Sequence, residues 1–135
     1  MKLLLRLALA ATFLHLAPAF AQAPKKAPPE LQKEFDVFIA KFRAALKAND
    51  SAAVAAMTKL PLETDDSVRD AAQFRAKTYK QHFTAKTRAC LQRSKPVYDR
   101  PPDNSEYYAI FCDDSIFMFA KTPDGFRFTD IGVND

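Results

Sequence analysis

Apolar residues between positions 31 and 49 recur every three or four places, which is the spacing of one face of an α-helix. The stripe is made of Leu31, Phe35, Phe38, Ile39, Phe42 and Leu46. Charged residues such as Lys33 and Arg43 fall on the other faces. Three phenylalanines on one face need a broad apolar surface to lie on, so we expect the rest of the chain to pack around this helix.

Three shorter helices are predicted to follow. The first covers the alanine-rich residues 52–57, the second residues 70–82, and the third residues 85–92, with Thr84 as its N-terminal cap. The apolar residues of the 70–82 helix do not share one face. Phe74 lies opposite Tyr79 when successive residues are set about 100° apart. We therefore expect this helix to be covered on two sides or to bend near its end.

From residue 97 onward the apolar period changes to alternation. The pattern predicts four strands, at residues 97–100, 106–112, 115–121 and 126–133. The segment 123–125, Pro-Asp-Gly, is a strong turn signal before the last strand. Unbroken alternation in that strand puts Asp130 on the side of Phe126 and Phe128, so we expect its carboxylate to point inward.

This order of elements predicts an α+β fold, with N-terminal helices packed on a curved C-terminal antiparallel sheet. Both faces of the middle strands are apolar or aromatic, and the helices cover one of them. The second face is then a pocket or a homodimer interface, or else the sheet curls enough to bury both faces within one chain. The pattern leaves these alternatives open.

The N-terminus carries the pattern of a secretory signal peptide. Lys2 and Arg6 precede an apolar run at residues 7–16, and residues 19–21 read Ala-Phe-Ala, a cleavage pattern. The apolar run is shorter than the ~20 residues that a membrane span needs. We expect cleavage near Ala21, a flexible Pro/Lys/Ala linker at residues 22–29, and a single domain at residues 30–135. The mature chain is expected to be periplasmic or secreted, with no transmembrane segment.

Charge and cysteines narrow the range of partners and chemistries. The formal net charge of the whole chain is +4, and two of its cations leave with the signal peptide, so we expect no nucleic-acid partner. Cys90 and Cys112 are the two cysteines, and in an oxidising compartment such a pair is most simply a disulfide. The competing interpretation is one reactive thiol near His82.

The sequence lacks the motifs of several catalytic classes. His82 is the only histidine after residue 21, whereas a zinc site needs three or four ligands, so we expect no metal. Gly125 and Gly132 are the only glycines, and neither a G-x-S-x-G elbow nor a phosphate-binding glycine-rich loop is present. We expect no cofactor.

Three stretches give the chain a likeness to a known superfamily. They are residues 35–62, with a helix, an Asn-Asp break, a second helix and a Pro-Leu segment; residues 74–83, with the pattern F-x4-Y-x3-F; and residues 124–128, Asp-Gly-Phe-Arg-Phe. In this order they resemble exported domains of the NTF2-like superfamily. The resemblance implies a cone-shaped α+β barrel. Members of that superfamily are isomerases or dehydratases with a carboxylate, histidine or tyrosine inside the cone, or binding modules.

This resemblance sets the candidate site residues. The catalytic candidates are Asp130 and His82, with Tyr107 and Tyr108 beside them, since apolar walls move the pKa of a buried acid or imidazole toward neutrality. The competing interpretation places Asp130 in water at a strand end, His82 at a helix end and the tyrosine hydroxyls at the rim. The expected ligand-binding residues are Tyr107, Tyr108, Phe117, Phe119 and Phe128.

We expect a non-catalytic exported binding module for a small apolar ligand or an envelope protein partner. The alternatives are a cofactor-free acid/base enzyme that uses a carboxylate in the cone, and an inhibitor or assembly factor for another envelope protein.

Overall fold

The computed structural model describes residues 24–135, so the signal-peptide pattern lies outside the described part of the chain. The helices are α1 (Pro29–Lys47), α2 (Ser51–Ala56), α3 (Ala71–Gln73), the π-helix η1 (Phe74–Tyr79), α4 (Lys80–His82) and α5 (Ala85–Arg93). The strands are β1 (Val97–Asp99), β2 (Tyr107–Cys112), β3 (Ser115–Thr122) and β4 (Gly125–Val133). They form one antiparallel sheet in the order β1-β2-β3-β4. The expected α+β class, helices first and sheet second, is confirmed.

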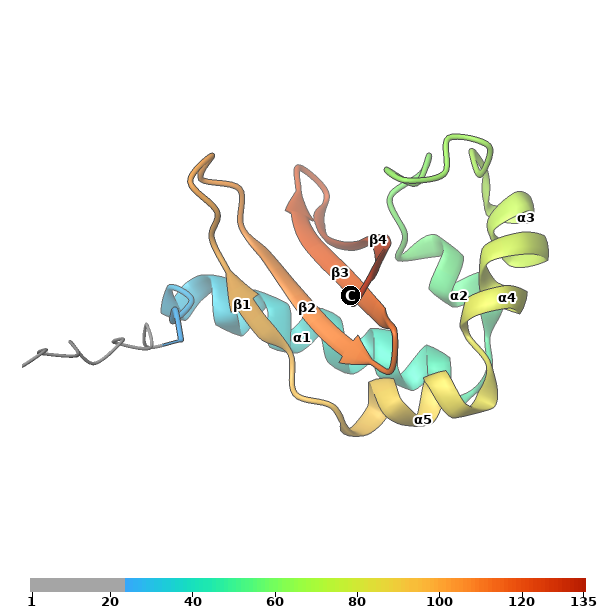
Figure 1. Ribbon diagram of the computed structural model, residues 1–135, viewed down its shortest axis with the longest axis horizontal. Coiled ribbons are helices and arrows are strands. Elements are labelled where there is room, and N and C mark those ends of the chain that lie inside the picture. Colours follow the sequence, from blue (N-terminus) through green and yellow to red (C-terminus); the bar gives the residue numbers. More distant parts are fainter. Residues whose placement is uncertain (1–23) are drawn as a thin grey trace, which may run out of the picture.

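Helix α1 is the central element, as the apolar stripe predicts. It begins with Pro29 at its first position, where the missing N–H costs nothing. It ends at Lys47, and Asn49 then takes a left-handed conformation with φ of 50°. Asp50 caps α2 by accepting from the backbone N–H of Ala53 at 3.0 Å. Figure 1 shows α1 crossing behind the strands, with α2, α3 and α4 gathered at one end.

The face of the sheet toward α1 is called the inner face here, and it carries the core. The Phe35 ring stacks on that of Tyr108 with centroids 3.7 Å apart, and Phe42 meets Phe119 edge to face at 5.1 Å. The inner-face side chains are Tyr108, Ile110, Cys112, Phe117, Phe119, Phe126 and Phe128, all of them buried. Burial of each large apolar side chain contributes about 1.5–3 kcal/mol, so this aromatic cluster dominates the stability of the fold.

The helix predicted at residues 70–82 forms with a different geometry from the one expected. Its middle, η1, is π-helical, and hydrogen bonds in a π-helix join residues five apart. Phe74 and Tyr79, which are five positions apart, therefore both reach the core, at 0% and 6% exposure. Tyr79 stacks on Phe83 at 5.2 Å. The wider π-helical turn, rather than burial of the helix on two sides, brings Phe74 and Tyr79 into the same core.

A β-bulge in β4 overturns the expected orientation of Asp130. Phe119 lies opposite Phe128 while Met118 lies opposite Asp130, so Thr129 is an extra residue in β4. Directly opposite residues share a face, so Asp130 lies with Met118 on the face away from α1. Ile131 takes the inner position opposite Phe117. The bulge keeps the Asp130 carboxylate out of the phenylalanine cluster. Burying an unpaired charge there would cost several kcal/mol, and even a neutral polar group would cost ~1–3 kcal/mol.

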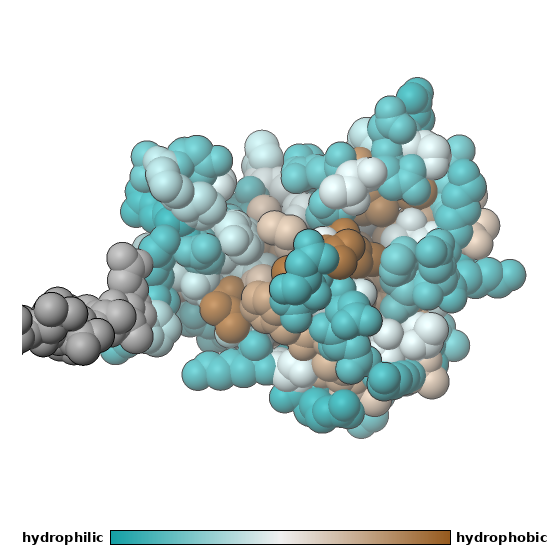
Figure 2. All heavy atoms as spheres, in the orientation of Figure 1, coloured by the Kyte–Doolittle hydropathy of each residue, from teal (hydrophilic) through white to brown (hydrophobic). Residues whose placement is uncertain are grey.

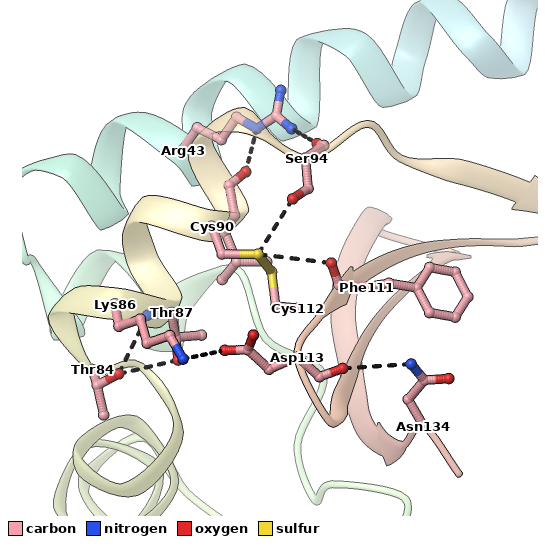
Figure 3. Close-up of a disulfide and its surroundings, with 11 residues drawn as sticks. Arg43, Thr84, Lys86, Thr87, Cys90, Ser94, Phe111, Cys112, Asp113 and Asn134 are labelled. Carbon is pink, nitrogen blue, oxygen red and sulfur yellow. Dashed lines mark hydrogen bonds and ion pairs between the residues drawn. A yellow bond between two sulfur atoms is a disulfide. The ribbon is translucent and has the colours of Figure 1, made fainter.

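Cys90 and Cys112 are joined as the sequence predicts. Their sulfur atoms lie 2.11 Å apart, at disulfide distance, with Cα atoms 5.9 Å apart. The Ser94 hydroxyl lies 3.3 Å from the Cys90 sulfur (Figure 3). The bond joins α5 to the end of β2, so one covalent link connects the helical half to the sheet.

Polar contacts hold α5 on both of its sides. The Arg43 guanidinium of α1 donates to the carbonyl oxygens of Leu91 and Ser94, at 2.9 and 2.6 Å. Lys86 pairs with Asp113 in the β2–β3 turn at 2.9 Å (Figure 3). The Asp113 partner raises the pKa of Lys86, and Lys86 lowers that of Asp113. Both groups are exposed, so the pair positions α5 more than it stabilises it.

The described part of the predicted linker lies against the domain. The Lys25 ammonium donates to Asp99 Oδ1 at 2.9 Å and to the carbonyl oxygen of Arg100 at 2.7 Å. Arg100 directly follows the edge strand β1, and Lys25 satisfies its carbonyl oxygen. Within residues 24–135, no helix combines the length and the apolar character that crossing a membrane requires.

Candidate functional site

Asp130 lies on the sheet face away from α1, here called the outer face, and is 7% exposed. Thr64, in the loop between α2 and α3, donates its hydroxyl to Asp130 Oδ1 at 2.5 Å. The carboxylate is therefore neither on the inner face of the sheet nor at an open strand end. Its proposed catalytic role stays a prediction.

His82 ends α4 and is partly buried, which lowers the pKa of its imidazole because burial disfavours the charged form. Among the described residues, no hydrogen bond or ion pair joins His82 to Asp130. The two catalytic candidates are thus not assembled into an acid/base pair. General acid/base chemistry needs such groups within hydrogen-bond reach of one substrate.

The three expected ligand-binding phenylalanines lie inside the packed core. Phe117, Phe119 and Phe128 are at most 1% exposed. Phe83 packs edge-on against both Phe117 and Phe128, with centroids 5.4 and 5.6 Å away. Ligand contact at these rings would require packed side chains to move, and none of the three lines the surface hollows described below.

The two expected tyrosines lie on opposite faces of β2. Tyr108 is on the inner face, 2% exposed, and donates its hydroxyl to Gln32 Oε1 at 3.0 Å. Burial, with a contribution from the charge of Asp36, raises the pKa of Tyr108 to about 12. Tyr107 is on the outer face and donates to Asp99 Oδ2 at 3.1 Å, and its burial raises its pKa as well.

The outer face carries an exposed apolar surface, here called the outer patch. Register puts Val97 beside Ala109, Met118 opposite Ala109, and Ile116 opposite Phe111. The patch consists of Val97, Tyr107, Ala109, Phe111, Ile116, Met118 and Ala120. Phe111 is 45% exposed and Val97 46%, whereas every other phenylalanine in residues 24–135 is buried. The sheet therefore does not curl enough to bury both of its faces.

Figure 2 looks at the molecule from the side of the strands and shows hydrophobic side chains gathered over the sheet between hydrophilic ones. Asp99 and Arg127 stand at the margin of the outer patch, at register positions opposite Tyr107 and Ala120. An apolar centre with a charged margin is the usual anatomy of a protein interface.

Two surface hollows have volumes of about 490 to 560 Å³. The α1 groove, about 560 Å³, lies between α1 and the start of β4, with Val37, Phe38 and Phe126 in its wall and both glutamates and lysines around it. The β1-edge hollow, about 490 Å³, is walled by the segment 24–27, by Gln32 of α1, by residues 95–98 and by Tyr108. Of these two, only the β1-edge hollow contains an expected ligand-binding residue, and a further hollow of about 390 Å³ on the outer patch is lined by Tyr107.

Within residues 24–135, no three histidine, cysteine, aspartate or glutamate side chains lie together as a metal site requires. The chain matches no protein-family model, no curated protein and no solved structure.

The sequence pattern missed the contribution of residues 24–27. Lys25 and Lys26 stand in a proline-rich run that predicts a linker, and nothing in that run indicates its contact with β1. The only local signal is that the run is short and directly precedes a strong helix start, which keeps it close to the fold.

Proposed function

We propose that this chain is an exported, non-catalytic binding module of NTF2-like type, which binds an envelope protein partner through the outer patch. The observation that carries the proposal is the half-exposed Phe111, near the turn end of an apolar sheet face, in a chain that buries its other described phenylalanines. Soluble monomers seldom expose contiguous apolar patches of more than a few hundred Å² unless the patch has a partner.

The composition of the outer patch favours a protein partner over a small ligand. Tyr107, Phe111 and Met118 are residue types enriched in interface centres, and the charged groups stand at the margin. A small apolar ligand needs a concave site that covers most of its surface. The space between the inner face of the sheet and α1 is filled by rings such as Phe119 and Phe128, at 0% exposure, which argues against a ligand there.

Export is supported by the cysteine pair and by the N-terminal pattern. A disulfide across 22 positions persists in oxidising compartments and is rare in the cytosol. Residues 1–21 supply the charged start, the apolar run and the small-residue cleavage site of a signal peptide. The element order of long helix, short helices and curved sheet supports the NTF2-like type.

The test uses one position on each side of the molecule. A photo-crosslinking amino acid replaces Phe111, or Val37 as the control, because Val37 is an apolar residue of similar exposed fraction, 55%, on α1. Irradiation of exporting cells should give an adduct of defined mass at position 111 and none at 37. Adducts of equal yield at both positions would contradict the proposal. An adduct of twice the chain's mass would show that the partner is a second copy of this chain, and would also contradict it.

The captured protein is then purified and its affinity measured. Phe111→Glu should weaken binding by about tenfold or more, because it places a charge within the apolar outer patch. Val37→Glu, the same kind of change on α1, should leave the Kd within about twofold. Equal losses in both variants would show that the outer patch is not the binding surface.

A further inference from the structure

The β1-edge hollow borders the outer patch at Val97 and has a charge pattern of its own. Its charged lining residues are Lys25, Lys26 and Lys95, and no carboxylate lines it. The α1 groove, by contrast, mixes Glu30 and Glu34 with its cations. Lysines from the N-terminal segment and from the residue before Pro96 thus meet across one hollow, although they lie far apart in the sequence.

The polar side-chain atoms of the floor already have hydrogen-bond partners within the protein. Gln32 accepts from the Tyr108 hydroxyl at 3.0 Å and donates to Asp36 at 2.8 Å. The Tyr98 hydroxyl donates to Glu106 at 2.7 Å. Tyr98 therefore offers ring surface rather than a free hydroxyl, and with Ala27, Pro96 and Val97 it makes an apolar floor, while Tyr108, which is 2% exposed, lies at the base of that floor.

The three lysines are not equivalent. Lys25 is held by Asp99 and by the Arg100 carbonyl oxygen. Lys26 and Lys95 are both exposed, and the ion pairs formed within residues 24–135 include neither of them. These two ammonium groups are free to meet an anion at the mouth.

From this arrangement we infer that the β1-edge hollow binds a small carboxylate with an apolar body. The carboxylate lies at the Lys26 and Lys95 end, and the body lies on the Tyr98 ring, with the nearly buried Tyr108 at the base of the floor. The reverse orientation is disfavoured, because Asp36 and Glu106 stand behind the tyrosine end and would repel an anion there. The volume of about 490 Å³ falls in the range of small-molecule sites.

This inference goes beyond the proposed partner binding and does not depend on it. Phe111 does not line the β1-edge hollow, so Phe111→Glu should bind the carboxylate as the wild type does. Failure of the carboxylate to bind would leave the outer patch as the partner surface, and failure of partner capture would leave the hollow unaffected.

The test is a titration followed by ring signals of ¹³C-labelled tyrosine. The chain has four tyrosines, of which Tyr98 and Tyr108 line the hollow and Tyr79 lies on η1, away from it. The probe is 4-phenylbutyrate, with 4-phenylbutan-1-ol as its uncharged match and decanoate as a second carboxylate. We expect saturable shifts at Tyr98 and Tyr108, none at Tyr79, tighter binding of the carboxylate than of the alcohol, and weaker carboxylate binding at high salt.

Charge-removing variants identify the cations. Lys26→Gln and Lys95→Gln should each weaken 4-phenylbutyrate binding by about two- to fivefold, which is the range of a solvent-exposed charge pair, and should leave the alcohol unchanged. Lys47→Gln, an exposed lysine in the last turn of α1 outside the hollow, is the matched control and should bind as the wild type does.

Three results would overturn the inference. The first is no saturable shift at Tyr98 or Tyr108 with either carboxylate at millimolar concentration. The second is equal affinity for the alcohol together with no effect of either lysine change, which would make the hollow apolar without anion recognition. The third is a parallel shift of Tyr79, which would indicate non-specific binding.

Discussion

The two faces of the sheet are built from alternate residues of the same strands, yet their environments differ strongly. On the inner face Phe117 and Phe119 are at most 1% exposed and contact rings from the helices. On the outer face Phe111, in the neighbouring strand, is 45% exposed. The contrast separates two tasks, because the inner face stabilises the fold while the outer face can change its chemistry with little effect on folding.

The largest expected difference is between phenylalanines on the two faces. Phe119→Ala should lower the free energy of unfolding by about 3–5 kcal/mol, because it opens a cavity among packed rings. Phe111→Ala should lower it by less than about 1 kcal/mol, since the side chain is already half in water. Urea unfolding of both variants measures the two values, and equal losses would mean that the faces are not as different as their exposure indicates.

A second comparison uses the adjacent tyrosines of β2. The pKa of Tyr108 is raised to about 12 in the folded chain, whereas it is near 10 in the unfolded chain. Between these two pH values, the unfolded chain loses the Tyr108 proton more readily than the folded chain does. The Tyr108 contribution to stability is therefore complete below about pH 10 and declines up to about pH 12, by at most roughly 2–3 kcal/mol.

Stability curves against pH for wild type and Tyr108→Phe test this assignment. The variant loses the hydrogen bond to Gln32, and the alkaline decline of its curve should be shallower than that of the wild type. Tyr107→Phe, on the outer face, is the control and should keep the steep decline. If the wild type and Tyr108→Phe lose stability equally above pH 10, the buried Tyr108 hydroxyl is not the cause of the alkaline decline.

The smallest expected effect concerns the outer-face carboxylate. Asp130→Asn keeps an oxygen that can accept from Thr64, so it should change stability by less than about 1 kcal/mol. A double-mutant cycle of Asp130→Ala with Thr64→Val, in which each change removes the hydrogen bond, measures the coupling of the two side chains, which should be about 0.5–1.5 kcal/mol. No coupling would mean that the Thr64–Asp130 hydrogen bond does not contribute to stability in solution.

Local sequence signals predict most of the elements of this fold, but not the two places where an element departs from its regular period. The stripe from Leu31 to Leu46 predicts α1, and alternation from Val97 predicts the strands. A helical wheel drawn with 3.6 residues per turn cannot show that Phe74 and Tyr79 share a face, because they do so only in the wider π-helical turn, which depends on tertiary packing. A two-residue period likewise cannot show a bulge that keeps Asp130 away from the core.

The candidate sites were less predictable than the fold, for a physical reason. Aromatic residues in alternation indicate a sheet face but not whether helices fill the space above it, and here the rings of α1 fill it beside Phe119. The β1-edge hollow depends on the long-range approach of Lys26 to Lys95, which no local pattern encodes. Residue types could be proposed from the sequence, whereas their grouping required the fold.

The bulge at Thr129 also has an evolutionary meaning. It absorbs one residue of length in β4, and residues 130–133 remain paired with β3 as they would in a strand that lacked Thr129. A one-residue deletion at this position should therefore leave the sequence after it in phase with the sheet. Elsewhere in β4, the same deletion would turn each following side chain to the opposite face. In an alignment of descendants of this chain, position 129 is where a single-residue gap should be tolerated.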